Sequence, residues 1–264
     1  MSEEQYEVYA VKYAHLVRRS PDNFLGGDPH DVEMPLDYYV WVIRNAQRAV
    51  VVDTGFNEEM AKKRNRRIIR PVGDGISALG LAPGKVTDVV ITHMHYDHAG
   101  NLPLFGNARF HLQDKEMEFV TGRCMCHDMM RHPYEVDDVV HMVHCVYDRR
   151  VQFHDGAGQV APGIEVHHIG GHTRGIQAVR VRTKRGWVVL ASDASHFYAH
   201  MEGDRAFPIL YSLADMLEGF DRLRALATSP RHIVPGHDPL VMERYPAAGE
   251  GMADWVVRLD IEPK

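Results

Sequence analysis

The sequence predicts an α/β protein in which two mixed β-sheets pack face to face and helices cover their outer sides. Three observations lead to this prediction. Short apolar runs rich in β-branched residues recur along the 264 residues, and segments with helical spacing separate them. The order is strands, helices, then strands and helices again, which is typical of two packed sheets with helices outside. Hydrophobic residues make up 45% of the chain, which is enough to fill the core of such a fold.

The first half of the chain is expected to supply one set of strands. A loosely alternating opening strand precedes a long loop, which is indicated by recurring Pro and Gly. The segment Arg44 to Arg48 separates two β-rich runs and favours a hairpin. The expected strands are Tyr6 to Val17, Tyr38 to Ile43, Ala49 to Asp53, Val86 to Ile91 and Ala108 to Leu112, with the loop at Arg18 to Asp37 and a helix at Ile76 to Leu81.

The second half repeats this pattern. Three strand-like runs follow one another, and Lys184-Arg185-Gly186 indicates a turn between the last two. An amphipathic helix is expected over Ser212 to Leu226, because its apolar residues recur at helical spacing on one face. The expected strands are Ala161 to Ile169, Ala178 to Thr183, Trp187 to Ser192 and a short one at Arg231 to Val234.

The most informative segment is His93-Met94-His95-Tyr96-Asp97-His98, directly after the expected strand Val86 to Ile91. Imidazole and carboxylate groups suit a divalent ion of the zinc type, and a strand end can direct several of them to one point. Packing alone has no use for three imidazoles and a carboxylate there, since buried polar groups must be paired. The segment therefore predicts a metal site.

Three further candidate ligands lie downstream: His172, Asp193 and His237. Each follows an apolar, strand-like run and stands next to Gly or Ser. The chain contains 18 His, so each of these residues alone would suit a surface or core position equally well. Together with the first segment they make seven candidates. One tetrahedral zinc site takes four ligands, whereas two metals that share a bridging group can use seven. We therefore expect a dinuclear metallohydrolase.

Composition excludes several other classes. The formal net charge of −6 leaves no basic surface for nucleic acid or an anionic membrane. No apolar run approaches the ~20 residues of a membrane-spanning helix. The start, Met1 to Tyr6, lacks the layout of a signal peptide. The 3 Cys are an odd number and form no disulfide framework, so a cytoplasmic location is expected.

These motifs resemble those of the metallo-β-lactamase superfamily, and within it most the N-acyl homoserine lactonase branch. The matching motifs occur in family order over nearly the whole chain: Asp53-Thr54-Gly55, His93 to Gly100, Gly171-His172-Thr173, Ser192-Asp193 and Pro235 to Asp238. The resemblance implies an αβ/βα four-layer sandwich with the metals at the sheet edge. The expected organisation is one domain over residues 1–264, with a lid insertion at about 121–150.

The resemblance also assigns the ligands. It implies that His93, His95 and His172 hold one metal, that Asp97, His98 and His237 hold the other, and that Asp193 bridges them. Asp53 would orient ligands by hydrogen bonding. The expected cofactors are two Zn²⁺ per chain, although such ligands also accept Mn²⁺, Co²⁺ or Fe²⁺. A hydroxide held between the metals would then attack a small lactone or related ester, without a protein nucleophile.

The chain departs from the lactonase pattern three residues after Asp193. The lactonases usually have a Tyr there, whereas this chain has His196, followed by Phe197 and Tyr198. An imidazole could donate a hydrogen bond to an oxyanion or protonate a leaving alkoxide. Alternatively Tyr198 takes that place through a shifted backbone, or His196 is structural or binds a substrate carboxylate. The candidate catalytic residues are therefore Asp97, His196 and Tyr198.

The segment Thr121 to Arg150 is unusually rich in Met, His, Cys and aromatic residues. It would suit a helical lid over the metals, and ordinary core packing explains it equally well. A lid and a long early loop would also suit a homodimer. Alternative functions are a thioester hydrolase of the glyoxalase II type, a non-lactone ester or amide hydrolase, and a non-catalytic metal-binding sensor. The first is disfavoured because no basic cluster lies near the C-terminus.

Overall fold

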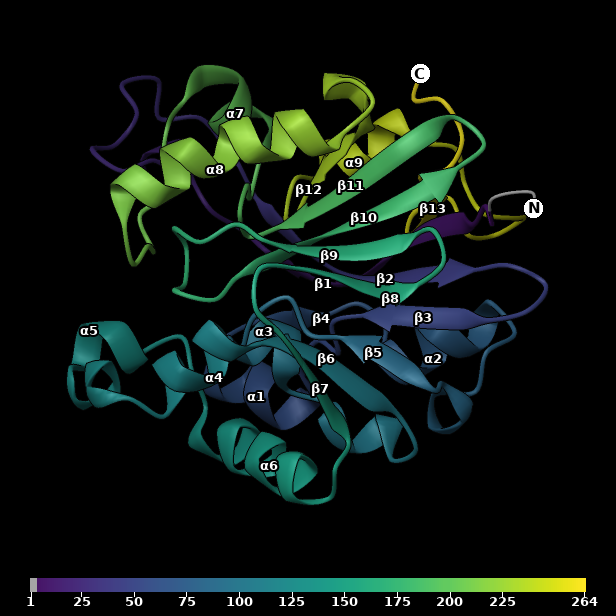
Figure 1. Ribbon diagram of the computed structural model, residues 1–264. Helices are drawn as coiled ribbons and strands as arrows, with labels where there is room; N and C mark the ends of the chain where they lie inside the picture. Colours follow the sequence, from purple (N-terminus) through teal and green to yellow (C-terminus); the bar gives the residue numbers. More distant parts are fainter. Residues whose placement is uncertain (1–3) are drawn as a thin grey trace.

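Two mixed β-sheets pack face to face between two layers of helices in the computed structural model, which describes residues 4–264 (Figure 1). The predicted α/β sandwich is therefore confirmed. Residues 1–3, on which part of the signal-peptide argument rests, lie outside the described residues. Within residues 4–264, no helix has both the length and the apolar character needed to span a bilayer.

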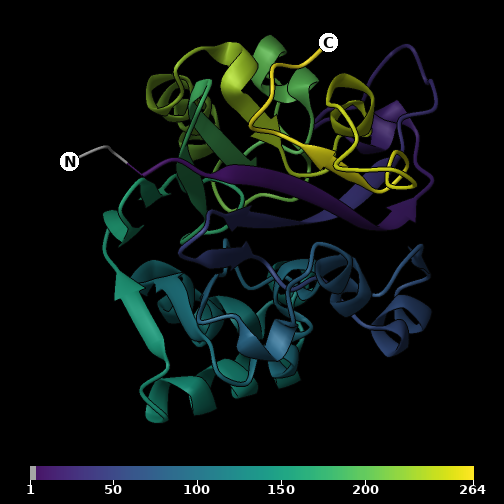
Figure 2. The same cartoon turned by 90° about the vertical axis from the view of Figure 1, so that its right-hand side faces the viewer.

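The first sheet has eight strands in the order β13-β1-β2-β3-β5-β6-β7, and β4 pairs with β1 beside this path. Strands β3, β5, β6 and β7 run parallel, whereas β1 pairs antiparallel with both β2 and β13. Figure 2 shows β1 and the C-terminal strand β13 side by side. The strands are β1 (Glu7–Leu16), β2 (Leu36–Arg44), β3 (Ala49–Val52), β4 (Arg67–Ile68), β5 (Asp88–Val90), β6 (Arg109–Gln113), β7 (Val151–His154) and β13 (Val256–Arg258).

The second sheet has five strands in the order β12-β11-β10-β9-β8. All its neighbours are antiparallel except β11 and β12, which run parallel. The strands are β8 (Ala157–Ala161), β9 (Ile164–His168), β10 (Gln177–Thr183), β11 (Gly186–Ser192) and β12 (Ile233–Pro235).

The helices form the two outer layers (Figure 1). Helices α7 (Tyr198–Gly203), α8 (Leu213–Leu226) and α9 (Leu240–Arg244) lie on the side of the second sheet. The side of the first sheet carries α1 (Glu58–Lys63), α2 (Val72–Ala78), α3 (Tyr96–Ala99), α4 (Asp114–Val120), α5 (Asp128–Arg131) and α6 (Val136–Tyr147).

Strand β2 shows why the sheets stack. Successive side chains of a strand point to opposite faces, and almost every residue of β2 is buried. Tyr39, Trp41 and Ile43 join the core between the two sheets, whereas Val40 and Val42 join the core beneath the helices. Such a strand needs a cover on both sides, so the apolar run seen in the sequence predicts an inner strand.

One predicted strand is wrong. The expected strand Ala161 to Ile169 is divided between β8, which ends at Ala161, and β9, which begins at Ile164. The chain turns between them at Pro162 and Gly163, because Gly163 has a φ of +80° that other residues rarely adopt. The two strands then pair antiparallel as a hairpin.

Strand directions bring the candidate ligands to one edge of the sandwich. In the first sheet, β3 and β5 are parallel with Val52 opposite Val90, so Asp53 and the segment that begins at His93 leave at the same end. In the second sheet, β11 and β12 are parallel with Ser192 opposite Pro235. Asp193 and His237 therefore leave together, and His172 follows β9, which runs in the same direction.

The carboxylate of Glu116 on α4 joins the loops from the two sheets. Its Oε1 accepts a hydrogen bond from the backbone N–H of Met94, at 2.9 Å. Its Oε2 accepts from Thr173 Oγ1 at 2.6 Å and from the N–H of Gly175 at 3.1 Å. Glu116 is fully buried, so these bonds offset the cost of desolvating its carboxyl group. They also hold the loop of His93 and His95 against the loop of His172.

We predict that Gly175→Ala destabilises the fold by roughly 1–3 kcal/mol, the usual cost of overpacking a filled site. A Cβ at residue 175 would lie 2.1 Å from the backbone N of Glu116, so α4 would have to move. Urea unfolding of the metal-free protein measures the effect. The control is Gly106→Ala, where a Cβ has open space and φ is −58°. Equal unfolding midpoints for the two variants would contradict the prediction.

Candidate metal centre

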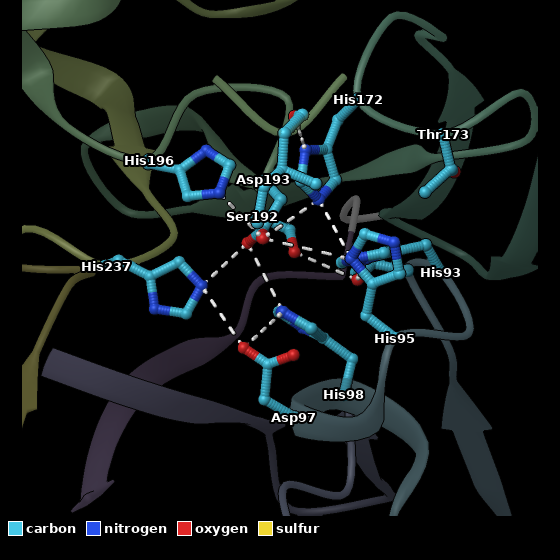
Figure 3. Close-up of polar contacts among 12 residues, drawn as sticks. His93, His95, Asp97, His98, His172, Thr173, Ser192, Asp193, His196 and His237 are labelled. Carbon is cyan, nitrogen blue, oxygen red and sulfur yellow. Dashed lines mark hydrogen bonds and ion pairs between the residues drawn. The ribbon is translucent and has the colours of Figure 1, made fainter. Parts of the chain in front are cut away.

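The structure brings all seven predicted ligands together at the edge of the two sheets (Figure 3). They form two donor groups around one carboxylate. The first donor group is His93, His95 and His172, whose ligand atoms and those of Asp193 all lie within 4.8 Å of one another. The second donor group is Asp97, His98 and His237, which meets the same limit.

Asp193 lies between the two donor groups, and its two oxygens face different groups. Oδ2 is 3.3 Å from His172 Nε2 and 3.8 Å from His93 Nε2 in the first group. Oδ1 is 2.9 Å from His237 Nε2 and 3.3 Å from His98 Nε2 in the second. Figure 3 shows these contacts converging on the carboxylate. One carboxylate in this position can serve two cations at once.

Several ligands are oriented by a hydrogen bond on the far side of the imidazole ring. His172 Nδ1 donates to the carbonyl of Ile209 at 2.8 Å, and His237 Nδ1 donates to the carbonyl of Asp37 at 2.9 Å. His98 Nδ1 donates to the carboxylate of Asp53 at 2.7 Å. Because Nδ1 donates in each case, Nε2 is the nitrogen that faces the centre and is available to a metal ion.

Asp53 also organises the backbone beneath the centre. It has a φ of +63°, and its carboxylate accepts from both the N–H and the hydroxyl of Thr92, at 2.7 and 2.8 Å. Thr92 Oγ1 in turn contacts Ser192 Oγ at 2.9 Å, and Ser192 has a φ of +48°. Two residues in this rarely used backbone region therefore flank the site, which is where such strain typically gathers.

The loop of His237 reaches Asp193 only because a glycine precedes it. A Cβ on Gly236 would lie 2.7 Å from the carbonyl carbon of Ser192 and 2.8 Å from Asp193 Oδ1. Real Cβ atoms essentially never approach so closely. The glycine of the Pro235-Gly236-His237 motif is thus required for close backbone approach.

The electrostatics of the cluster suit bound cations. Burial lowers the pKa of His93 and His95 well below the usual value, and neighbouring histidines lower it further. These two rings are therefore neutral donors. Burial also opposes charge on His98 and His237, but Asp193 and other nearby carboxylates raise the pKa of both rings. A divalent cation can take the place of the positive charge that these carboxylates attract.

Among the buried side-chain atoms of residues 4–264 that have no hydrogen-bond partner, three belong to the predicted ligands: His93 Nε2, His98 Nε2 and Asp193 Oδ1. Leaving such atoms unpaired is costly, so native proteins almost always satisfy them. All three point into the cluster, and nitrogen and carboxylate oxygen are ordinary ligands of divalent metals. The donor set therefore fits metal ions.

His196, which stands where the lactonases usually have a Tyr, also lies in the cluster. Its Nε2 is 3.0 Å from Asp193 Oδ2, and its ring stacks on Phe207 with centroids 3.6 Å apart. Its Nδ1 is buried without a hydrogen-bond partner in residues 4–264. The ring is thus fixed in place, and one nitrogen lies beside the carboxylate that the two donor groups share.

Tyr198 does not lie with the cluster. Its backbone N–H donates to Asp238 Oδ2 at 2.9 Å, and its ring lies against the guanidinium of Arg244. It lines a separate cavity with Arg244 and Tyr245, and burial raises its pKa. The phenols near the cluster include Tyr38 and Tyr96, whose hydroxyl oxygens are 3.5 Å apart, and Tyr134, whose ring packs on His95.

Sequence reasoning missed Tyr96 and Glu116 as residues of the site. Tyr96 lies inside the metal motif, so its position offered a signal. Glu116 belongs to a short polar helix segment without any motif, so no sequence pattern singled it out.

The segment Thr121 to Arg150 forms α5, α6 and a short 3₁₀ turn, and it lines a cavity of about 760 Å³. The wall is partly apolar, with Val120, Met125 and Val139. This cavity shares Arg64 and His132 with a smaller cavity of about 80 Å³ that contains the donor groups. The segment thus lies beside the centre.

Comparison with known proteins agrees with this architecture. A model of the metallo-beta-lactamase superfamily matches residues 34–237. An N-acyl homoserine lactonase from a Bacillus species is 24% identical over 226 residues, which cover 78% of this chain and 80% of the relative. N-acyl homoserine lactonase AttM from Rhizobium johnstonii is 26% identical over 247 residues, which cover 85% of this chain and 89% of the relative.

Solved structures share the fold. A quorum-quenching N-acyl homoserine lactone lactonase superposes with a TM-score of 0.74 at 20% identity, covering 90% of this chain and 95% of that chain. A probable metal-dependent hydrolase from Staphylococcus aureus gives a TM-score of 0.72 at 16% identity, covering 100% of this chain and 97% of the other. Because the family model matches most of the chain, the protein belongs to the metallo-beta-lactamase superfamily.

Proposed function

We propose that this protein binds two divalent metal ions, zinc in the first instance, and hydrolyses a lactone or a related ester. The observation that carries this proposal is the position of Asp193, whose two oxygens face two separate donor groups. A mononuclear site would leave one of these groups, and one of these oxygens, without a cation. The lactone class is supported by the relatives, which are named as N-acyl homoserine lactonases.

In this proposal the first donor group holds one metal, the second donor group holds the other, and Asp193 bridges them. Two such ions would supply a water of lowered pKa and a Lewis acid for the substrate carbonyl. The protein's part is to hold the ligands in fixed orientations and to keep the site dry. Asp53, Glu116 and the carbonyls behind His172 and His237 do the first.

We assign His196 the role of a hydrogen-bond donor to the substrate. Its Nε2 lies 3.0 Å from Asp193 Oδ2, so in this proposal it adjoins a substrate carbonyl or leaving oxygen held at the centre. Stacking on Phe207 fixes the ring plane, so little orientational freedom is lost when the hydrogen bond forms. Asp97 contributes as a ligand of the second group. Tyr198 is left without a catalytic role in this proposal, since it lines another cavity.

The segment at 121–150 is proposed to form the wall of the substrate site. The cavity beside it, about 760 Å³, falls in the range that binds small molecules, about 300–1,000 Å³. Its Met and Val side chains would cover the apolar part of a substrate whose carbonyl lies at the donor groups. The adjoining residues Arg64 and His132 link the two cavities.

The first test is the opening of a medium-chain N-acyl homoserine lactone by the zinc-loaded protein, followed as release of acid. We expect chelation to abolish hydrolysis and zinc to restore it, because no side chain replaces the metal-activated water. Hydrolysis that survives complete metal removal would contradict the metal mechanism. If the metal-loaded protein does not open this lactone but hydrolyses simple esters, the proposed substrate class is esters and not lactones.

Metal content tests the bridging role of Asp193. We expect His95→Ala to retain about one zinc per chain, because only one donor group is damaged. Asp193→Asn should lose affinity for both ions, because both groups share its carboxylate. His167→Ala is the control, since His167 pairs with Glu165 on β9 outside the cluster. The measurement is zinc per chain after dialysis, and two ions retained by Asp193→Asn would rule out bridging.

His196→Ala should lower kcat by on the order of a hundredfold while zinc content stays at the wild-type value, as expected for loss of a positioned donor. His196→Gln, which keeps an N–H group, should recover part of the rate. Kinetics on the substrate found in the first test, together with zinc analysis, checks this. An unchanged kcat for His196→Ala would return His196 to a structural role.

A further inference from the structure

Two arginines without an acidic partner line the cavity that contains the donor groups. Arg18, Arg64 and Arg66 all contribute to its wall, and its acidic residues are Asp97 and Asp193, which belong to the metal cluster itself. Three guanidinium groups therefore border a cavity of about 80 Å³, and a neutral lactone would pair with none of their charges. The charged residues of this cavity therefore indicate the charge of the substrate.

Strand pairing holds Arg18 and Arg66 near each other. Arg18 lies two residues beyond the end of β1, and Arg66 comes directly before β4. These strands pair antiparallel with His15 opposite Arg67, so both arginines lie at the end of the same strand pair (Figure 1). The backbone thus brings two like charges together at the edge where the ligands meet.

Arg64 has a carboxylate partner, and the other two do not. Arg64 bonds Glu135 Oε1 through both Nε and Nη2, at 3.0 and 2.6 Å. Arg66 donates instead to Tyr96 Oη at 3.1 Å and to the carbonyl of Arg64 at 2.6 Å. Arg18 donates to the carbonyl of Asp22. Within residues 4–264, no carboxylate comes within ion-pairing distance of Arg18 or Arg66.

Neutral partners position a guanidinium without neutralising it. Both side chains are only partly exposed, so each has lost part of its hydration. Burial lowers the pKa of Arg18; the charge of Asp22 opposes this shift, and the charge of Arg66 adds to it. If these arginines only braced the loop, neutral side chains could make the same bonds to carbonyl and phenol oxygens without the repulsion.

Arg18 also adjoins the proposed hydrogen-bond donor. Its guanidinium lies 5.4 Å from the centroid of the Phe207 ring, and that ring stacks on His196. A substrate held by His196 therefore lies within a short distance of Arg18. The planar fork of a guanidinium matches a carboxylate or a phosphate, to which it can donate two parallel hydrogen bonds.

We infer that Arg18 and Arg66 bind an anionic oxygen group of the substrate, so that the preferred lactone or ester carries a negative charge near its reactive carbonyl. The inference rests on the proposed function, which it narrows from lactones in general to anionic ones. A carboxylate is the simplest group of this kind, and it serves as the probe below.

The kinetic test compares 5-oxotetrahydrofuran-2-carboxylate with its neutral carboxamide on the zinc-loaded protein. We expect kcat/KM to favour the carboxylate by about tenfold or more, the usual worth of a charge-assisted hydrogen bond. Arg66→Gln and Arg18→Gln should each reduce this preference by about tenfold. Arg66→Lys, which keeps the charge, should retain much of it. Ratios in both Gln variants equal to the wild-type ratio would overturn the inference.

The matched control is Arg67→Gln. Arg67 is the next residue along the chain, is exposed and does not line the cavity, so its variant should keep the wild-type ratio. A drop in that ratio equal to the drop in Arg66→Gln would show a general effect of net charge and would overturn the inference. If Arg66→Gln does not fold, as judged by thermal unfolding, Arg18→Gln decides the question.

A binding measurement separates this inference from the proposed reaction. Metal-free protein is titrated calorimetrically with glutarate and with neutral glutaramide at low salt. We expect the wild type to bind glutarate in preference to glutaramide and Arg66→Gln to lose that preference. If glutarate binds as expected but neither lactone is opened, the result supports the anion site and contradicts the proposed lactone hydrolysis. If both lactones open equally and glutarate does not bind, the hydrolase stands and the anion site is overturned.

Discussion

The structure depends on one buried carboxylate that two groups of ligands share. Asp193 is almost fully buried, and imidazole nitrogens of both donor groups lie within 4 Å of its oxygens. Burial disfavours charge on Asp193, yet the surrounding histidines, His196 and His237 first, lower its pKa well below the usual value. Such a concentration of polar groups is stable only when each is paired. The loops at this edge of the sandwich are therefore built to supply partners.

Those partners come from behind the ligands. Asp53 joins His98 to the backbone at Thr92, and Glu116 joins the His95 loop to the His172 loop. Gln177, at the start of β10, donates to the carbonyl of Ile91 at 2.8 Å and so connects the second sheet to the first. The two sheets could slide only by breaking these bonds. Rigid placement of the ligands is thus a consequence of how the sheets are joined, which is what a preorganised centre requires.

Strands and helices with a regular spacing of apolar residues could be predicted from the sequence. Contacts between residues far apart in the chain could not. The strand before His93 and the helix Ser212 to Leu226 follow periodicity, and both are present with slightly different ends. The expected strand Ala161 to Ile169 failed because a Pro-Gly turn inside it outweighed its apolar character. Glu116 and Arg66 escaped notice because their roles depend on partners far along the chain.

The candidate metal ligands and the residues proposed to select the substrate lie in different parts of the fold. The candidate ligands follow β5, β9, β11 and β12, and the parallel pairs β3–β5 and β11–β12 bring their loops to one edge of the sandwich. Arg18 and Arg66 flank the short pairing of β1 with β4, and the segment at 121–150 lines much of the larger cavity. These outer segments can change length and charge without moving the ligands, because loops tolerate substitution where packed strands do not. The rim of the site can therefore vary while the cluster stays the same, so the family match alone does not determine the substrate.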